Sequence, residues 1–144
     1  MGKFYLLVLA FCCGVFPLRA QSIHFDRLDI NDGLSQNTVT SIIQDDKGFM
    51  WFGTKDGLCR YDGKSFKTFM HDPRLTAGLG NSLIKRLVQD HGHRIWVGTD
   101  SGLYIYDPET EHFSSVPLYA ADGKPVTKPI SILDCDREGR VWIV

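Results

Sequence analysis

Cysteine is scarce in this sequence, and so is any excess of charge. The chain has 144 residues and four cysteines, of which Cys12 and Cys13 lie in the first twenty positions. Cys59 and Cys135 fall in separate runs with strand character, so we interpret both as buried free thiols, although export would permit a disulfide. The net charge is −1 and Lys and Arg are scattered. The sequence therefore predicts no binding of nucleic acid by this segment.

Long hydrophobic runs are almost absent, and the one that exists lies at the start of the chain. It extends from Phe4 to Phe16, which is shorter than the roughly 20 residues of a membrane-spanning helix. Lys3 precedes the run and Ala20 follows it, a pattern typical of a secretory signal peptide cleaved after Ala20. A lipoprotein signal remains an alternative that Phe11 disfavours, and an uncleaved anchor is another.

Catalytic signatures are also lacking. No Ser-His-Asp arrangement, phosphate-cradling glycine loop or pair of catalytic carboxylates can be defended, so we expect no catalytic, cofactor or metal site. The sequence His91-Gly92-His93 could be half of a metal site, but solvated turn histidines are the favoured interpretation. The sequence Asp134–Gly139 imitates the start of a calcium loop, yet the flanking helices of such a loop are missing.

Instead, one sequence motif occurs twice. "MWFGTKDGLCRYDG" begins at Met50 and "IWVGTDSGLYIYDP" at Ile95, and the Trp residues are 45 positions apart (96 − 51). A third copy begins in "ISILDCDREGRVWIV", where Asp136 precedes Trp142 by six residues, as Asp45 precedes Trp51. A period of this length is typical of propellers and helical arrays.

The content of each copy favours the propeller. In the first copy, short β-branched or aromatic runs alternate with Gly- and Asp-rich turns, and no run has a useful helical period. The expected strands are Val39–Asp45, Phe49–Thr54, Leu58–Asp62 and Ser65–Met70. Four antiparallel strands make one propeller blade, so we predict an all-β fold with two full blades and part of a third.

The repeated residues have structural roles in this interpretation. Each Trp is expected to fill the space between neighbouring blades, and the Gly two positions later leaves room for a close neighbour. The Asp accepts backbone N–H bonds in its turn, and the Gly three before Trp adopts a positive φ. His93 stands at that Gly position in the second copy, so we expect a differently built turn there. The structural repeat positions are Trp51, Trp96, Trp142, Gly53, Gly98, Asp45, Asp90, Asp136, Gly48 and Gly139.

On these residues the sequence resembles the two-component regulator propeller repeat. The segment Phe25–Asp45 also resembles the start of the periplasmic sensor region of Bacteroides-type hybrid histidine kinases. The resemblance implies a non-enzymatic periplasmic sensor in an inner-membrane receptor, with a saccharide ligand, a homodimeric full protein and a C-terminal kinase absent from this chain. Two alternatives stay open: a sensor propeller of a cyclic-dinucleotide synthase, and part of an exported propeller enzyme such as a polysaccharide lyase or quinone-dependent dehydrogenase.

The repeats predict an incomplete propeller. Fewer than three repeats fit after the signal peptide, whereas propellers close with four to eight blades, so we expect an N-terminal fragment of a longer receptor that supplies the missing blades. The linkers His71–Asn81 and Tyr119–Pro129 are the expected places for ligand contacts. The parts are a signal peptide (1–20), a strand that closes the ring (21–32), blade repeats (33–77 and 78–128) and the start of a third repeat (129–144).

Overall fold

The computed structural model describes residues 23–144, and the predicted signal peptide lies outside them. The described residues contain a short 3-10 helix, η1 (Ile30–Asp32), and otherwise only strands. The strands are β1 (Val39–Gln44), β2 (Met50–Thr54), β3 (Gly57–Tyr61), β4 (Phe66–Phe69), β5 (Ile84–Gln89), β6 (Ile95–Thr99), β7 (Gly102–Asp107), β8 (His112–Val116), β9 (Leu118–Tyr119), β10 (Pro125–Val126), β11 (Leu133–Cys135) and β12 (Val141–Ile143).

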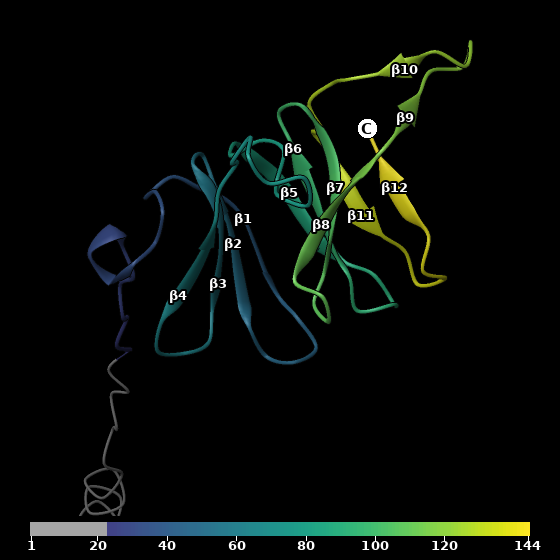
Figure 1. Cartoon of the computed structure of the whole chain (residues 1–144). Helices are drawn as coiled ribbons and strands as arrows, with labels where there is room; N and C mark the ends of the chain where they lie inside the picture. The colour runs from purple at the N-terminus through teal and green to yellow at the C-terminus, as the bar shows by residue number, and fades with distance from the viewer. Residues whose placement is uncertain (1–22) are drawn as a thin grey trace, which may run out of the picture.

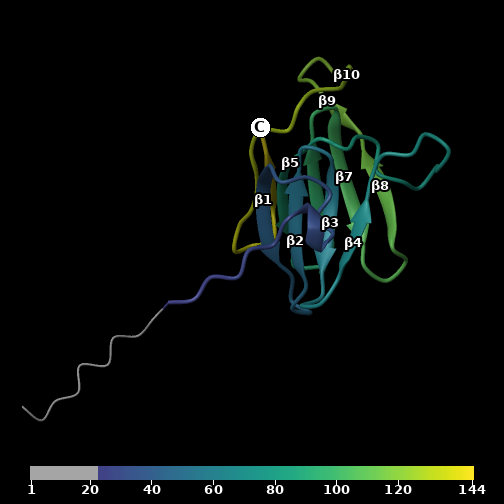
Figure 2. The ribbon, with the colours of Figure 1, turned by 90° about the vertical axis from the view of Figure 1, so that its left-hand side faces the viewer.

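Two four-stranded antiparallel sheets form the body of the molecule. Strands β1 to β4 make the first sheet and β5 to β8 the second, each in sequence order, and β11 pairs with β12 in a third, two-stranded sheet. The sheets stand next to one another like successive blades (Figure 1). Figure 2 views the stack from the side of the first sheet, with η1 in front of it. The described sheets are open and do not close into a ring, and the predicted all-β blade fold is confirmed.

The two full blades share their register as well as their strand order. In the first blade Trp51 pairs with Ile43 and Arg60, and in the second Trp96 pairs with Val88 and Ile105. A β-bulge interrupts the first strand of each blade, between Val39 and Ser41 and between Ile84 and Arg86. Because side chains alternate across a strand, equal register places equivalent residues on equivalent faces of the blades.

The hydrophobic core lies between the blades. One cluster joins the first blade to the second. Its buried aromatic members are Trp51, Tyr106 and Phe113, and the partly buried Phe69 packs against them. A second cluster joins the second blade to the two-stranded sheet through Leu103, Ile130 and Leu133. Blade-to-blade burial of this kind makes each blade depend on its neighbour for stability.

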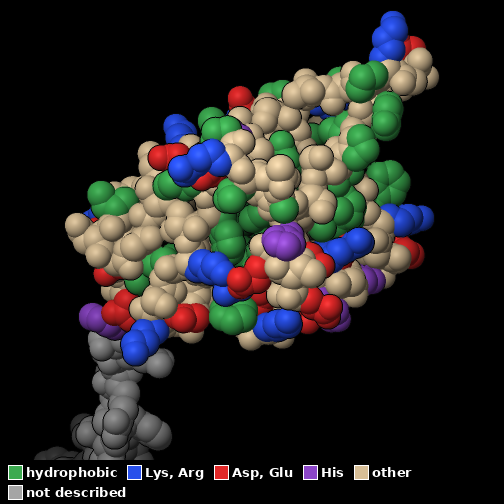
Figure 3. Space-filling model, in the orientation of Figure 1, with side chains coloured by type: hydrophobic (Ala, Val, Ile, Leu, Met, Phe, Trp, Pro, Cys, Tyr) green, Lys and Arg blue, Asp and Glu red, His purple; other side chains and the backbone are tan. Residues whose placement is uncertain are grey.

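The two ends of each blade differ. The turns after β1 and β3 lie along the lower edge in Figure 1, and the linkers between blades lie along the upper edge. Charged side chains of both signs gather along the lower edge in the space-filling view (Figure 3). Strands β9 and β10 pair as a small hairpin that extends away from the upper edge, and the hairpin begins at Leu118, one residue before the predicted 119–129 linker.

The N-terminal segment is held by local caps. The Asp29 side chain accepts a hydrogen bond from Asn31 N, and the Asp32 carboxylate accepts one from Asp29 N, so η1 carries a capping box. Residues 23–29 form no strand here, and the ring-closing strand expected over 21–32 stays a prediction. Within residues 23–144, no helix has the length and hydropathy required to cross a bilayer.

Candidate functional site

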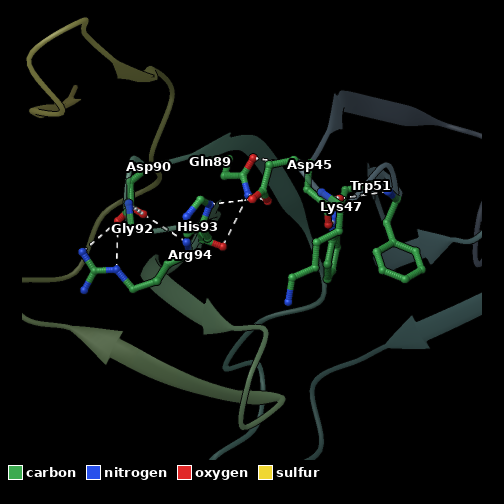
Figure 4. Close-up of polar contacts among 10 residues, drawn as sticks. Asp45, Lys47, Trp51, Gln89, Asp90, Gly92, His93 and Arg94 are labelled. Atoms are coloured by element: carbon green, nitrogen blue, oxygen red, sulfur yellow. Dashed lines mark hydrogen bonds and ion pairs between the residues drawn. The ribbon is translucent and has the colours of Figure 1, made fainter.

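The repeat is built around a carboxylate that closes a turn. Asp45 Oδ1 accepts hydrogen bonds from Lys47 N at 3.0 Å and Phe49 N at 2.9 Å. Asp45 Oδ2 accepts a third from the indole Nε1 of Trp51 at 2.8 Å, and this contact is buried (Figure 4). The carboxylate therefore joins the β1–β2 turn to the aromatic side chain that fills the blade junction.

The same unit recurs twice with an added cation. Trp96 Nε1 donates to Asp90 at 2.7 Å, and Arg94 pairs with the same carboxylate at 2.8 Å. Burial by itself would raise the pKa of Asp90, but the Trp96 and Arg94 hydrogen bonds outweigh it and lower that pKa. In the third copy, burial is likewise outweighed by the hydrogen bonds from Trp142 and Arg140, and the pKa of Asp136 falls to about 2. Both aspartates are ionised at neutral pH.

One expectation about these turns is wrong. The sequence predicted a differently built turn at His93, because Gly48 and Gly139 occupy its position in the other copies. In the structure His93 adopts a positive φ of 65°, beside 89° for Gly48 and 80° for Gly139. All three residues donate their N–H to the carbonyl of the repeat aspartate at 3.0 Å. The aspartate hydrogen bonds impose the turn, and a histidine is among the non-glycine residues that tolerate the left-handed region.

The glycine two residues after Trp lies at the closest approach between blades. A Cβ at Gly53 would lie 2.7 Å from Cγ2 of Ile84, which begins the next blade. A Cβ at Gly98 would lie 2.9 Å from Cγ2 of Ile130 at the second junction. No side chain fits at that distance, so each glycine forms a socket for an isoleucine of the following blade.

The three tryptophans differ in how far they are covered. Trp51 is fully buried between the first two blades and meets Tyr106 edge-on, with the ring centroids 5.0 Å apart. Trp96 is half-buried and packs against the second core cluster. Trp142 is 57% exposed, because among residues 23–144 no further sheet lies against it.

Polar side chains join the first two blades along the lower edge. Asp46, from the first blade, accepts a hydrogen bond from Gln89 Nε2 at 2.6 Å and lies 2.6 Å from His93 Nδ1 (Figure 4). The Gln89 hydrogen bond is the main cause of a lowered Asp46 pKa. His93 lies in a turn with its side chain 66% exposed, as the sequence predicted, and it also contacts Asp46 of the first blade.

A second polar group joins the same blades nearer the outer strands. Glu111, in the β7–β8 turn, pairs with Lys67 at 2.6 Å and Arg60 at 3.4 Å, both from the first blade. The Lys67 hydrogen bond is the main cause of a lowered Glu111 pKa. Glu111 adopts a positive φ of 57°. Sequence reasoning missed this group, because Glu111 and Lys67 lie outside the repeated motif and no spacing pattern relates them to Arg60.

The linker predicted to carry ligand contacts lies over a cleft. Residues 74–79 cover a hollow of about 480 Å³ between the outer strands of the first two blades. The linker is held in place by a hydrogen bond from Phe113 N to Ala77 O at 3.0 Å and by the contact of His71 Nδ1 with Leu79 O at 2.9 Å. The predicted 119–129 linker borders a smaller hollow of about 230 Å³ at the base of the β9–β10 hairpin.

Both remaining cysteines are free thiols. The prediction of burial is confirmed for Cys59, whose Sγ lies 3.1 Å from Ser35 Oγ, and is wrong for Cys135, which is partly exposed. Burial raises the pKa of the Cys135 thiol, and the nearby Asp136 carboxylate adds to the effect. Within residues 23–144, no group of three or more His, Cys, Asp or Glu side chains is arranged to hold a metal ion.

The fold and the repeated Asp–Trp–Gly unit define a protein built of propeller blades. Residues 33–56 match the family model described as "Two component regulator propeller", which confirms the repeat recognised in the sequence. A curated relative, "Histidine kinase P4" from Formosa agariphila, is 37% identical over 75 residues, which make up 51% of this chain and 5% of the relative.

Solved structures extend the similarity to most of the chain. The extracellular domain of the putative hybrid two-component system BT3049 from B. thetaiotaomicron superposes with a TM-score of 0.73 at 30% identity, over 82% of this chain and 17% of that one. The extracellular domain of BT4673 from the same organism, described as a putative hybrid two-component system, has a TM-score of 0.62 at 25% identity, over 87% of this chain and 17% of that one. The chain thus spans less than a fifth of the solved chains that it matches. Those matches are extracellular domains of signalling systems and not catalytic domains.

Proposed function

We propose that this chain is the N-terminal, ligand-sensing propeller part of a hybrid two-component receptor. One observation carries the proposal: 82% of the chain superposes on the extracellular domain of a putative hybrid two-component system with a TM-score of 0.73. The similarity to a histidine kinase over 75 residues supports a kinase as the output. In this proposal the receptor is anchored in the inner membrane, works as a homodimer and places the blades in the periplasm.

The proposed signal is a saccharide. The blade scaffold fits such a role, because loops on a rigid β framework commonly carry recognition. Propellers close with four to eight blades, so further blades of the same receptor would complete the ring. The blade units would run over 33–77, 78–128 and from 129 onwards, with residues 21–32 closing the ring as a strand.

A genetic experiment tests this function. The gene would be deleted in its native organism, and transcript levels would be measured on single purified polysaccharides, with a complemented strain as the control. We expect one saccharide class to induce a set of transcripts in the wild type and the complemented strain but not in the deletion strain. An unchanged transcript response to every polysaccharide would refute the sensor role, and saccharide turnover by the purified protein would favour an enzyme.

A further inference from the structure

We propose that the cleft beneath the 71–81 linker is a binding site for a saccharide ring, and that a ligand there touches two blades at once. The inference rests on the proposed function and specifies the site of recognition. Three parts of the chain line the cleft: the end of β4, linker residues 74–79 and the start of β8. Its volume of about 480 Å³ lies in the range of small-molecule sites, about 300–1,000 Å³.

The floor of the cleft is aromatic and rigid. Phe69 from the first blade and Phe113 from the second both line it, and their ring centroids are 5.5 Å apart in an edge-to-face arrangement. Phe69 also stacks on Trp51 at 6.0 Å, so the floor is continuous with the core between the blades. The negatively charged face of an aromatic ring attracts the C–H groups of a sugar, which is the contact that an apolar floor can offer to a pyranose.

The rim of the cleft carries polar groups and both signs of charge beside the exposed apolar side chains of Met70 and Leu75. Arg74, Thr76 and Thr68 supply a guanidinium and two hydroxyls, and Glu111 supplies a carboxylate. Such groups donate and accept hydrogen bonds, as the hydroxyls of a saccharide require. Glu111 pairs with Lys67 and Arg60, and Arg74 pairs with Asp72, so these groups hold fixed positions. Their remaining donor and acceptor capacity, together with the two hydroxyls, fits a hydroxyl-rich ring better than a purely apolar ligand.

Glu111 is held in a conformation that its residue type disfavours. Its φ of 57° lies in the left-handed region, which non-glycine residues adopt only at a cost in free energy. Lys67 and Arg60 fix its carboxylate from the first blade. A side chain preorganised in this way presents its oxygens to a ligand with little further loss of entropy.

Two further hollows within residues 23–144 fit a sugar less well. The groove on the lower edge, about 390 Å³, is lined by charged and turn residues such as Lys47, Arg94 and Glu109 and has no aromatic side chain. The hollow beside the β9–β10 hairpin holds about 230 Å³. Of these three hollows, only the cleft under the 71–81 linker combines two aromatic side chains with a volume in the range of small-molecule sites.

The position of the cleft suggests how binding would be transmitted. Its floor and walls come from β4 of the first blade and from the start of β8 in the second. A ligand that contacts both walls binds most tightly at one spacing of the two blades. It therefore stabilises the arrangement of the blades that has this spacing, and a ligand signal requires such a difference in affinity between two arrangements.

Binding to the purified full chain tests the site. The probes are cellotetraose, xylotetraose, mannotetraose, maltotetraose and tetragalacturonate, followed by saturation-transfer NMR and then titration calorimetry for those that bind. The variants are Thr76→Trp, which fills the cleft, Glu111→Gln, which removes the charge with little change of shape, and Arg74→Ala. The matched control is Arg137→Ala, an exposed arginine on the third blade. Circular dichroism verifies that each variant is folded.

We expect at least one probe to bind, Thr76→Trp to abolish its binding, and Glu111→Gln and Arg74→Ala to weaken it about tenfold, with Arg137→Ala unchanged. Binding of no probe, or equal binding by the wild type and Thr76→Trp, overturns the site. The two proposals fail separately: if cells respond to a saccharide through this gene and the Thr76→Trp receptor responds equally, the site is wrong and the sensor function stands.

Discussion

The indole Nε1 of Trp51 donates a buried hydrogen bond of 2.8 Å to Asp45, six residues earlier in the chain. The same pair occurs between Asp90 and Trp96 and between Asp136 and Trp142, at 2.7 and 2.8 Å. The aspartate thus orients the residue that fills the blade junction and closes the turn at the same time. The repeat conserves this geometry along the chain while the burial of the Trp changes.

We expect Asp45→Ala to destabilise the fold by about 1–3 kcal/mol, because it leaves a buried indole N–H and two turn N–H groups without their acceptor. Urea denaturation followed by Trp fluorescence measures the change. Asp136→Ala is the comparison: it removes the equivalent turn and indole bonds around the exposed Trp142, together with the ion pair to Arg140. Water replaces the carboxylate at this exposed site, so the cost should be smaller. Equal costs would contradict the role assigned to burial.

We expect Gly53→Ala to cost about 1–3 kcal/mol, because the new methyl group would overlap Ile84 across the blade junction. A double-mutant cycle with Ile84→Ala separates this overlap from a change in the backbone. In the Ile84→Ala background the overlapping methyl is gone, so Gly53→Ala should cost much less in urea denaturation. Additive effects of the two substitutions would show that the socket is not the cause.

Gly48, three positions before Trp51, gives a test of backbone strain alone. No atom lies within 4 Å of a Cβ placed at Gly48, and its φ is 89°, so Gly48→Ala should cost about 1–2 kcal/mol through strain without a clash. His93→Ala serves as the comparison, because that position already holds a non-glycine residue and loses only the contact with Asp46. Thermal unfolding should rank Gly48→Ala as the more destabilising of the two.

Stability should fall in acid through the repeat aspartates. The pKa values of Asp90 and Asp136 are lowered in the folded chain, that of Asp136 to about 2, whereas an unfolded aspartate titrates near about 3.9. Their contribution is therefore present above the unfolded pKa and is lost as the pH falls through the folded pKa, which for Asp136 is about 2. Urea midpoints measured from pH 6 to pH 2 should drop in that window, and Asp136→Asn should flatten the drop. A profile that is unchanged by Asp136→Asn would contradict this assignment.

Much of the fold could be predicted from the sequence because it repeats. Alternating runs such as Ser65–Met70 and glycine-rich turns predicted the strands of the first blade within one or two residues at each end. The repeated Asp, Trp and Gly positions indicated where blades pack. The large side chain of Trp and the missing side chain of Gly are known from the residue type alone, without the tertiary structure. The turn at His93 was mispredicted. The preference for glycine at a positive φ is weak, and the hydrogen bonds of Asp90 hold a histidine in the same conformation.

The sequence alone determined the class of blade, its strand order and the residues at its junctions, because hydrophobic alternation and turn chemistry act over a few neighbours. Only the tertiary structure decided which Trp is covered, which carboxylates join the blades and where the cleft under the 71–81 linker lies. Glu111, Lys67 and Arg60 come from different blades and meet only after the sheets have packed. Such contacts depend on the angle and spacing between sheets, which no short-range pattern specifies.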